Sequence, residues 1–195
     1  MAGSTMPPVS RIAAGQRLFR VHALSRGAHW YGRKDAQWRW DDPDRRYGVL
    51  YLGKSLVGPF AETILRTPAE RDILWDVIAS KRFSTFMTTR AVRLARVHGP
   101  GLAWFRTTSA TVSADFDPAL PGTPYEATQR ISAMAHALGG LDGIQYRSRL
   151  DSDALCVALF DRADDAIRLE TEGCRLEKDW VRAILRPRGY RLIES

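Results

Sequence analysis

A chain of 195 residues, 45% of them hydrophobic and 26% charged, can bury the core of one domain without metals or disulfides. No apolar run approaches the roughly 18 residues that a membrane-spanning helix needs, and residues 1–11 contain no apolar segment of a signal peptide, so we expect neither a membrane protein nor a secreted one. The net charge of +7 comes mainly from arginine, since all but four of the 29 basic residues are arginines, and it fits an anionic ligand, an acidic partner or a nucleic acid.

The two cysteines bear on the compartment of the protein. Cys156 lies inside the apolar run 154–160 and is expected to be a buried small hydrophobic residue. A disulfide with Cys174 is possible, but no spacing pattern supports it. We therefore expect a protein of the reducing cytoplasm.

The amino-terminal third of the chain begins with a predicted flexible arm. Residues 1–10 contain Pro7 and Pro8 and predict a loose arm, with a single domain over residues 11–195. Residues 17–22 predict the first strand, and residues 23–47 a long ordered loop, a kind of segment that is often functional in compact domains.

Two further elements follow this loop. The β-rich run GVLYL, residues 48–52, predicts a buried strand. Apolar residues at helical spacing then predict a helix from an N-cap at Ser55 through Arg66. Residues 67–70 (TPAE) have the form of a capping box with proline at the first helical position, and they predict a second helix that buries Ile78.

The remaining elements mix strands and helices. Residues 86–97 alternate well enough for one strand, and residues 107–123 predict a long loop. A second capping box, residues 123–126 (TPYE), predicts a helix that ends near Leu138, before two glycines. Further expected elements are strands at residues 143–146, 154–160, 167–169 and 190–193 and a helix at 179–185. Because strict βαβ alternation is missing, we expect an α+β fold, with a mixed sheet flanked by helices in one compact domain.

Several common site motifs are missing from the sequence. No glycine-rich dinucleotide motif follows a strand, and there is no phosphate-binding loop with its lysine. The nucleophile elbow of serine hydrolases is missing too. The four histidines have no metal-ligand spacing with cysteines or carboxylates, so we expect no metal site.

Two residues stand out within these elements. Tyr51 interrupts an otherwise apolar strand, and Glu62 lies between Phe60 and Ile64 on the helix that follows. A carboxylate with apolar neighbours either points outward or needs a partner in the interior. Spacing alone favours an outward-facing Glu62 and a core Tyr51, because amphipathic helices commonly carry outward carboxylates.

The order of five short segments changes this interpretation. It resembles the RES domain, a family named for Arg, Glu and Ser and found in bacterial toxin–antitoxin pairs. The segments are LFRV at 18–21, RWDDP at 39–43, VLYL at 49–52, FAET at 60–63 and YRS at 146–148. The resemblance spans about residues 16 to 160. It departs from the common pattern at Trp38, where many members have glycine, and at Gly53, where many have alanine.

The resemblance implies a fold similar to that of ADP-ribosyltransferases and an enzyme that consumes NAD. Residues 11–195 would then form one RES-type catalytic domain, with NAD as substrate and no metal or permanently bound cofactor. Glu62 would stabilise positive charge on the ribose as nicotinamide leaves. The other implied site residues are Arg39 on the diphosphate, Tyr51 against the nicotinamide ring, Ser148 near the sugar, and Arg20 and Tyr31 as further NAD contacts.

The resemblance also implies a partner, while leaving the acceptor open. Family members pair with a helix-turn-helix antitoxin, and the basic surface would attract an acidic one. ADP-ribose could pass to water, to phosphate or to a protein. The alternative from another class is a non-catalytic basic binding module, associated with nucleic acid, which would not need Arg39, Tyr51 and Glu62 to converge.

Overall fold

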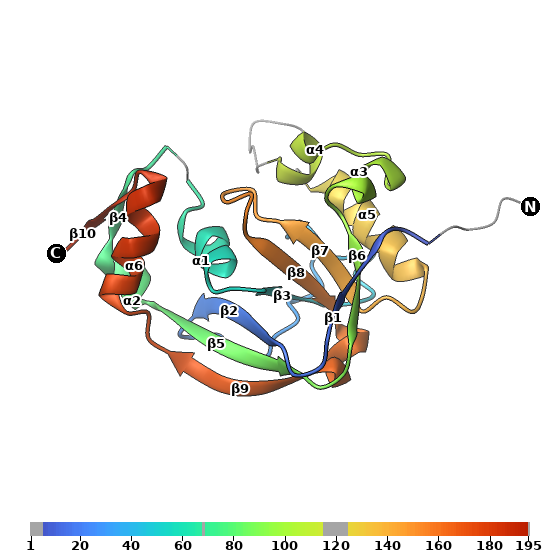
Figure 1. Ribbon diagram of the computed structural model, residues 1–195, viewed down its shortest axis with the longest axis horizontal. Coiled ribbons are helices and arrows are strands. Elements are labelled where there is room, and N and C mark those ends of the chain that lie inside the picture. Colours follow the sequence, from blue (N-terminus) through green and yellow to red (C-terminus); the bar gives the residue numbers. More distant parts are fainter. Residues whose placement is uncertain (1–5, 68, 115–124, 195) are drawn as a thin grey trace, which may run out of the picture.

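A mixed sheet forms the body of the protein in the computed structural model, which describes residues 6–67, 69–114 and 125–194. Its eight strands lie in the order β1-β6-β7-β8-β3-β2-β5-β9 (Figure 1). The β6–β7 pair is parallel and the other neighbours are antiparallel. Along the sheet the strands are β1 (Val9–Ile12), β6 (Val92–Arg96), β7 (Gly143–Arg147), β8 (Leu155–Phe160), β3 (Val49–Gly53), β2 (Arg17–Ala23), β5 (Lys81–Thr88) and β9 (Ile167–Cys174).

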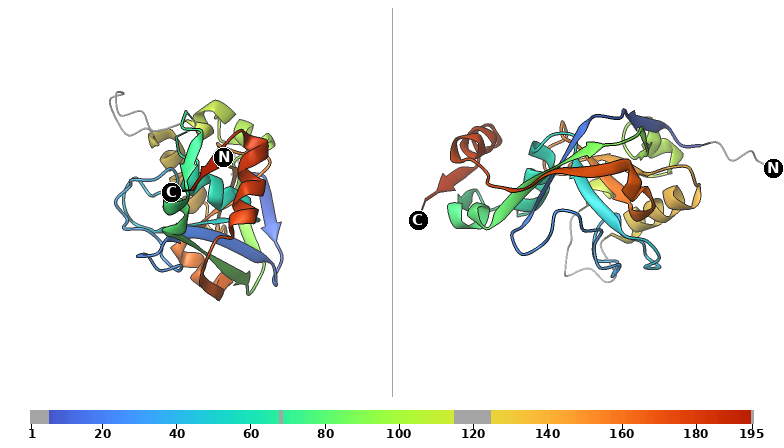
Figure 2. Two further views of the ribbon diagram at one scale, coloured as in Figure 1. Left: turned by 90° about the vertical axis from the view of Figure 1, so that its left-hand side faces the viewer. Right: turned by 90° about the horizontal axis from the view of Figure 1, so that it is seen from below.

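Helices and a small second sheet complete the architecture. In this sheet β10 (Arg191–Ile193) pairs in parallel with β4 (Asp72–Leu74). Figure 2 shows β4, β10 and α6 gathered at one end of the large sheet, with α3, α4 and α5 at the opposite end. The α-helices are α1 (Val57–Ile64), α2 (Trp75–Ala79), α3 (Pro100–Trp104), α4 (Ser109–Ser113), α5 (Glu126–Ala137) and α6 (Lys178–Leu185), and the 3-10 turns are η1 (Asp161–Ala166) and η2 (Arg186–Arg188).

The strands β2 and β3 separate along most of their length. They pair only at Phe19 and Gly53, whereas β2 pairs with β5 over seven residues and β3 pairs with β8 over five. The sheet is therefore open between β2 and β3, and the loop of residues 24–48 connects the two strands across this opening. This gap in the hydrogen-bond ladder creates space for a site within the sheet.

Three apolar clusters hold these parts together. One lies between the sheet and the α3–α5 end and includes Trp40 and Phe160. A second surrounds Leu50 and Phe86, and a third packs α1 and α6 together around Phe60. The α+β prediction, with one mixed sheet flanked by helices, is confirmed. Among the described residues no helix is both long and apolar enough to cross a bilayer.

The segment after α1 differs from the prediction. Instead of a second helix that begins at residue 67, the chain forms strand β4 and then the short helix α2, although Ile78 is buried as predicted. The capping-box pattern is local, whereas β4 gains parallel pairing with β10 from the far end of the chain. Long-range strand pairing therefore overrides the local helix signal here. Pro68 itself lies outside the described residues.

Other element boundaries also differ. Val9 and Ser10 belong to β1 and not to a loose arm, because they pair with β6. The single strand predicted at residues 86–97 is instead the end of β5 followed by β6. In the segment between them, the Thr89 N–H donates a hydrogen bond to the Ala166 carbonyl. The N-cap of α1 is Leu56, without a side-chain cap, so Ser55 does not have that role.

The central part of the chain contains two short helices that the sequence did not predict. Helix α3 has no predicted counterpart, and α4 lies inside the segment predicted as a loop. Helix α5 was predicted, although Thr123 of its proposed capping box lies outside the described residues. Both cysteines are free, and Cys156 is buried as expected.

Truncating a side chain in the central sheet should measure how far the fold depends on this core. Leu50 is fully buried, and Leu50→Ala should lower the free energy of unfolding by about 2–5 kcal/mol through lost burial and a cavity. Leu24 is 63% exposed, so the matched change Leu24→Ala should stay within about 0.5 kcal/mol. Urea unfolding followed by circular dichroism measures both, and equal losses would contradict the assignment of Leu50 to the core.

Candidate active site

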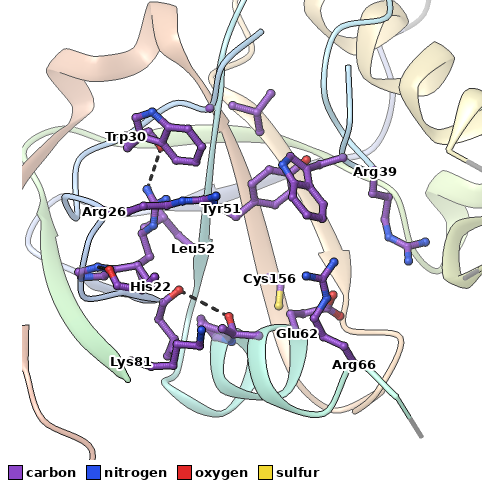
Figure 3. Close-up of a pocket in the computed structure, with 18 of the residues that line it drawn as sticks. His22, Arg26, Trp30, Arg39, Tyr51, Leu52, Glu62, Arg66, Lys81 and Cys156 are labelled. Carbon is purple, nitrogen blue, oxygen red and sulfur yellow. Dashed lines mark hydrogen bonds between the residues drawn. The ribbon is translucent and has the colours of Figure 1, made fainter. Parts of the chain in front are cut away.

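A cavity of about 490 Å³ occupies the opening between β2 and β3 (Figure 3). Residues 20–23 of β2 form one wall and Val49, Tyr51 and Leu52 of β3 form another. Helix α1 closes the floor with Pro59, Glu62 and Thr63. The cavity thus exists because two neighbouring strands diverge and a helix fills only part of the gap.

Two glycines allow helix α1 to pack closely against the sheet. A Cβ at Gly53 would lie 2.3 Å from Pro59 Cδ, and one at Gly58 would lie 2.8 Å from Cys156 Sγ. Neither contact is possible between real side chains. The absence of a side chain at Gly53 therefore allows α1 to pack against β3.

Glu62 projects from α1 into this cavity and is held by the loop after β7. Its Oε1 accepts a 2.6 Å hydrogen bond from Ser148 Oγ and a 3.0 Å bond from the Arg149 N–H. Ser148 is buried, and its Oγ accepts the Leu150 N–H at 3.2 Å. Ser148 does not line the cavity itself, but it contacts Glu62 directly.

Tyr51 is fixed by two hydrogen bonds at the end of its side chain. Its hydroxyl donates to Asp41 Oδ1 and accepts the Trp40 N–H, each at 3.0 Å. Asp41 Oδ2 in turn accepts the Trp38 N–H at 2.9 Å. Burial raises the pKa of Tyr51 well above its ordinary value, and the charge of Asp41 acts in the same direction. Tyr51 is therefore a neutral phenol with its ring against the cavity.

Arg39 lines the same cavity, but its head group is anchored to one side. One guanidinium nitrogen donates to the Val112 carbonyl, and the guanidinium carbon lies 5.1 Å from the centre of the Tyr125 ring. Figure 3 shows this side chain directed away from Tyr51. Arg39, Tyr51 and Glu62 do line one cavity, as predicted, although part of the Arg39 donor fork is already used.

Further cations line the cavity that sequence reasoning had not singled out. They are Arg26, Arg66, Lys81 and Arg149, in addition to Arg39 and Arg20. Among the described residues that line it, Glu62 is the single carboxylate. Arg66 follows Glu62 by four positions, and Arg149 follows Ser148 directly. Because both lie next to motif residues in the sequence, this proximity could have marked them as candidate cavity residues. Nothing local in the sequence marked Arg26 or Lys81.

The two predicted NAD contacts have different positions. Arg20 lines the cavity and is buried, and its Nη1 donates to the carbonyls of Ala28 at 2.7 Å and Trp30 at 2.8 Å. Burial and then the charge of Arg26 lower the pKa of Arg20 to about 10. Arg20 therefore holds the loop of residues 24–48 in place and also forms part of the cavity wall.

Tyr31 does not line the cavity, so the structure does not bring it together with the other residues predicted to contact NAD. Its carbonyl accepts the Val49 N–H at 2.9 Å, and a Cβ at Gly48 would lie 2.6 Å from that oxygen. The aromatic side chain instead borders a separate surface hollow with His29, Asp161 and Asp164. Tyr31 is a residue that ties the loop to β3. No cluster of three or more potential metal ligands occurs in the described parts of the chain.

Comparison with known proteins agrees with this combination of fold and site. The RES domain model matches residues 17–181, and the chain belongs to the RES domain family. Among solved structures, a chain of the M. tuberculosis MbcT–MbcA toxin–antitoxin complex is similar, with a TM-score of 0.63 and 13% sequence identity over 90% of this chain and 92% of that one. No curated protein matches the sequence.

The buried phenol of Tyr51 should make stability fall at alkaline pH. Its folded pKa is raised, so above about pH 10 the unfolded chain loses a proton that the folded chain keeps, and stability decreases by about 1.4 kcal/mol per pH unit. Tyr51→Phe removes this contribution, so the variant should lose stability less steeply above pH 10. Urea unfolding from pH 7 to 11.5 checks this, and parallel curves for the two proteins over that range would contradict it.

Proposed function

We propose that this RES-domain protein is the toxin of a toxin–antitoxin pair, an enzyme that cleaves the nicotinamide–ribose bond of NAD. It would pass ADP-ribose to water, to phosphate or to a protein acceptor. The observation that carries the proposal is the single lining carboxylate, Glu62, held in place at the wall of a cavity that six cationic side chains line.

The chemistry needs a fixed carboxylate at the sugar. When the C1′–N bond breaks, its electron pair leaves with the nicotinamide nitrogen, which becomes neutral, and positive charge develops on the ribose. A preorganised negative group beside that charge stabilises the transition state without reorganising. Glu62 has this character because Ser148 and the Arg149 N–H hold one oxygen, leaving Oε2 for a ribose hydroxyl or the developing charge.

The remaining side chains suit the rest of a dinucleotide. A volume of about 490 Å³ is in the range of sites that enclose small molecules. Guanidinium groups such as Arg66 match the diphosphate, which carries two negative charges. The ring of Tyr51 offers a flat surface to the nicotinamide, and Arg39 would bind either a phosphate or a ribose hydroxyl with the donors that Val112 leaves unused.

An antitoxin partner follows from the family and from charge. The similar solved structure is that of a toxin–antitoxin complex, and RES toxins are associated with helix-turn-helix antitoxins. The net charge of +7 and the cation-lined cavity favour an acidic surface or segment that covers the opening. Such a partner would inhibit by excluding the dinucleotide.

Removing the charge of Glu62 tests the proposal. Glu62→Gln keeps the size of the side chain and should lower kcat for nicotinamide release by about 100-fold or more, because the lost interaction acts mainly in the transition state. The matched control is Glu70→Gln, which makes the same change at an exposed position outside the cavity and should retain the wild-type rate.

Purified protein with NAD, with and without phosphate or a protein acceptor, gives the readout, and product analysis identifies where ADP-ribose goes. No nicotinamide release by the wild type, or equal rates for wild type and Glu62→Gln, would contradict the proposal. The second result would leave Glu62 without a catalytic role, and the first would favour the non-catalytic binding module.

Ser148 should act through Glu62. Ser148→Ala removes the 2.6 Å hydrogen bond to Glu62 Oε1, so the carboxylate should lose its fixed orientation. We expect kcat to fall about tenfold, because this factor corresponds to the free energy of one charge-assisted hydrogen bond. KM for NAD should stay within about twofold of the wild-type value. The matched control Ser55→Ala lies at an exposed position and should change neither constant. A rise in KM with unchanged kcat would assign Ser148 to ground-state binding and contradict this role.

A further inference from the structure

The cationic side chains of the cavity form two groups. In Figure 3, Arg39, Glu62 and Arg66 lie on one side of Leu52, and His22, Arg26, Trp30 and Lys81 lie on the other. The first group surrounds the carboxylate that would act on the nicotinamide ribose. The second group lies at the opposite end, where the adenosine half of a dinucleotide would extend.

Backbone contacts bring the residues of this second end together. Lys81 pairs with Ala23 across β2 and β5, and the Arg26 N–H donates to the Ala23 carbonyl at 3.0 Å. The Arg26 guanidinium lies 5.0 Å from the centre of the Trp30 ring, and that of Arg20 lies 5.9 Å from it. Arg20 and Arg26 therefore place positive charge beside one aromatic side chain, and Lys81 lies on the same side of Leu52 (Figure 3).

This charge has no counterpart in the described part of the chain. Neither Lys81 nor Arg26 forms an ion pair with a described residue, and Arg20 donates only to neutral carbonyls. The proximity of Arg20 and Arg26 is itself unfavourable, and it contributes to the lowered pKa of Arg20. Glu172 accepts the Ala28 N–H nearby but does not line the cavity. Three cationic side chains lie at one end of the cavity, and no carboxylate lines that end. This arrangement suits an anionic group on the ligand.

The diphosphate alone does not account for both groups of cations. Sites that select NAD commonly place a carboxylate on the 2′-hydroxyl of the adenosine ribose, and sites that accept NADP place an arginine there for the 2′-phosphate. In this cavity the one lining carboxylate is Glu62, at the opposite end. A 2′-phosphate adds about 1.5 to 2 negative charges, and an indole with neighbouring guanidinium planes offers a stacking surface for adenine.

We propose that Arg20, Arg26, Trp30 and Lys81 form a subsite for adenosine 2′-phosphate, so that the protein uses NADP in preference to NAD. The inference rests on the proposed function in taking a nicotinamide dinucleotide as the substrate. It goes beyond that function by naming which dinucleotide the cavity selects and which residues select it.

The first test compares kcat/KM for nicotinamide release from NADP and from NAD. The wild type should favour NADP by about 10-fold or more, the factor expected for a charge-assisted hydrogen bond to phosphate. Lys81→Gln and Arg26→Gln should each reduce that preference by lowering kcat/KM for NADP and leaving that for NAD within about twofold. Lys54→Gln, the same change at an exposed position outside the cavity, should keep the wild-type preference. Equal use of the two dinucleotides, or a preference unaffected by both variants, would overturn the subsite.

The second test measures binding without catalysis. Calorimetry with the Glu62→Gln protein should show adenosine 2′,5′-bisphosphate binding at least about 10-fold more tightly than AMP, and adding Lys81→Gln should reduce this difference. If neither dinucleotide reacts but this difference is present, the proposed function fails and the subsite stands. If NAD is cleaved and the bisphosphate binds no better than AMP, the subsite fails and the function stands. Inorganic phosphate that binds as tightly as the bisphosphate would also overturn it, by assigning these cations to free phosphate.

Discussion

The contact between Glu62 and the loop after β7 is the interaction on which the site depends. A carboxylate among apolar neighbours in a partly enclosed cavity needs hydrogen-bond donors, and Ser148 and the Arg149 N–H supply two to the same oxygen. These bonds join α1 to the β7–β8 region, two segments far apart in the sequence. They also leave the second carboxylate oxygen available, so one constraint both stabilises the fold and orients the charge that the chemistry requires.

The divergence of β2 and β3 provides the space in which this charge acts. A regular sheet would satisfy every backbone group between these strands, but here the ladder is reduced to the Phe19–Gly53 pair. Helix α1 can pack against the opened sheet because Gly53 and Gly58 leave room for Pro59 and Cys156. Strands β2 and β3 and helix α1 thereby form part of the cavity wall, which favours a preorganised position for the charge of Glu62.

Local patterns in the sequence were sufficient to predict β2, β3, β7, β8 and α6. The ordered family segments predicted Arg39, Tyr51, Glu62 and Ser148 as site residues, and the structure brings these four residues to the cavity or into contact with a residue that lines it. The segment of β4 was predicted incorrectly as a helix, because it becomes a strand through its pairing with β10 from the far end of the chain. The separation of β2 from β3 is likewise a property of the whole sheet. Arg26 and Lys81 enter the cavity only through that arrangement, and Tyr31, next in sequence to Trp30, points to a different hollow.

The most direct test of the central claim is a crystal structure of the Glu62→Gln protein with an intact nicotinamide dinucleotide. We expect the dinucleotide to occupy the opening between β2 and β3, with the nicotinamide ribose in contact with residue 62, the nicotinamide against Tyr51 and the diphosphate near Arg66. A dinucleotide bound elsewhere, or one whose nicotinamide ribose lies remote from residue 62, would contradict the catalytic role of Glu62.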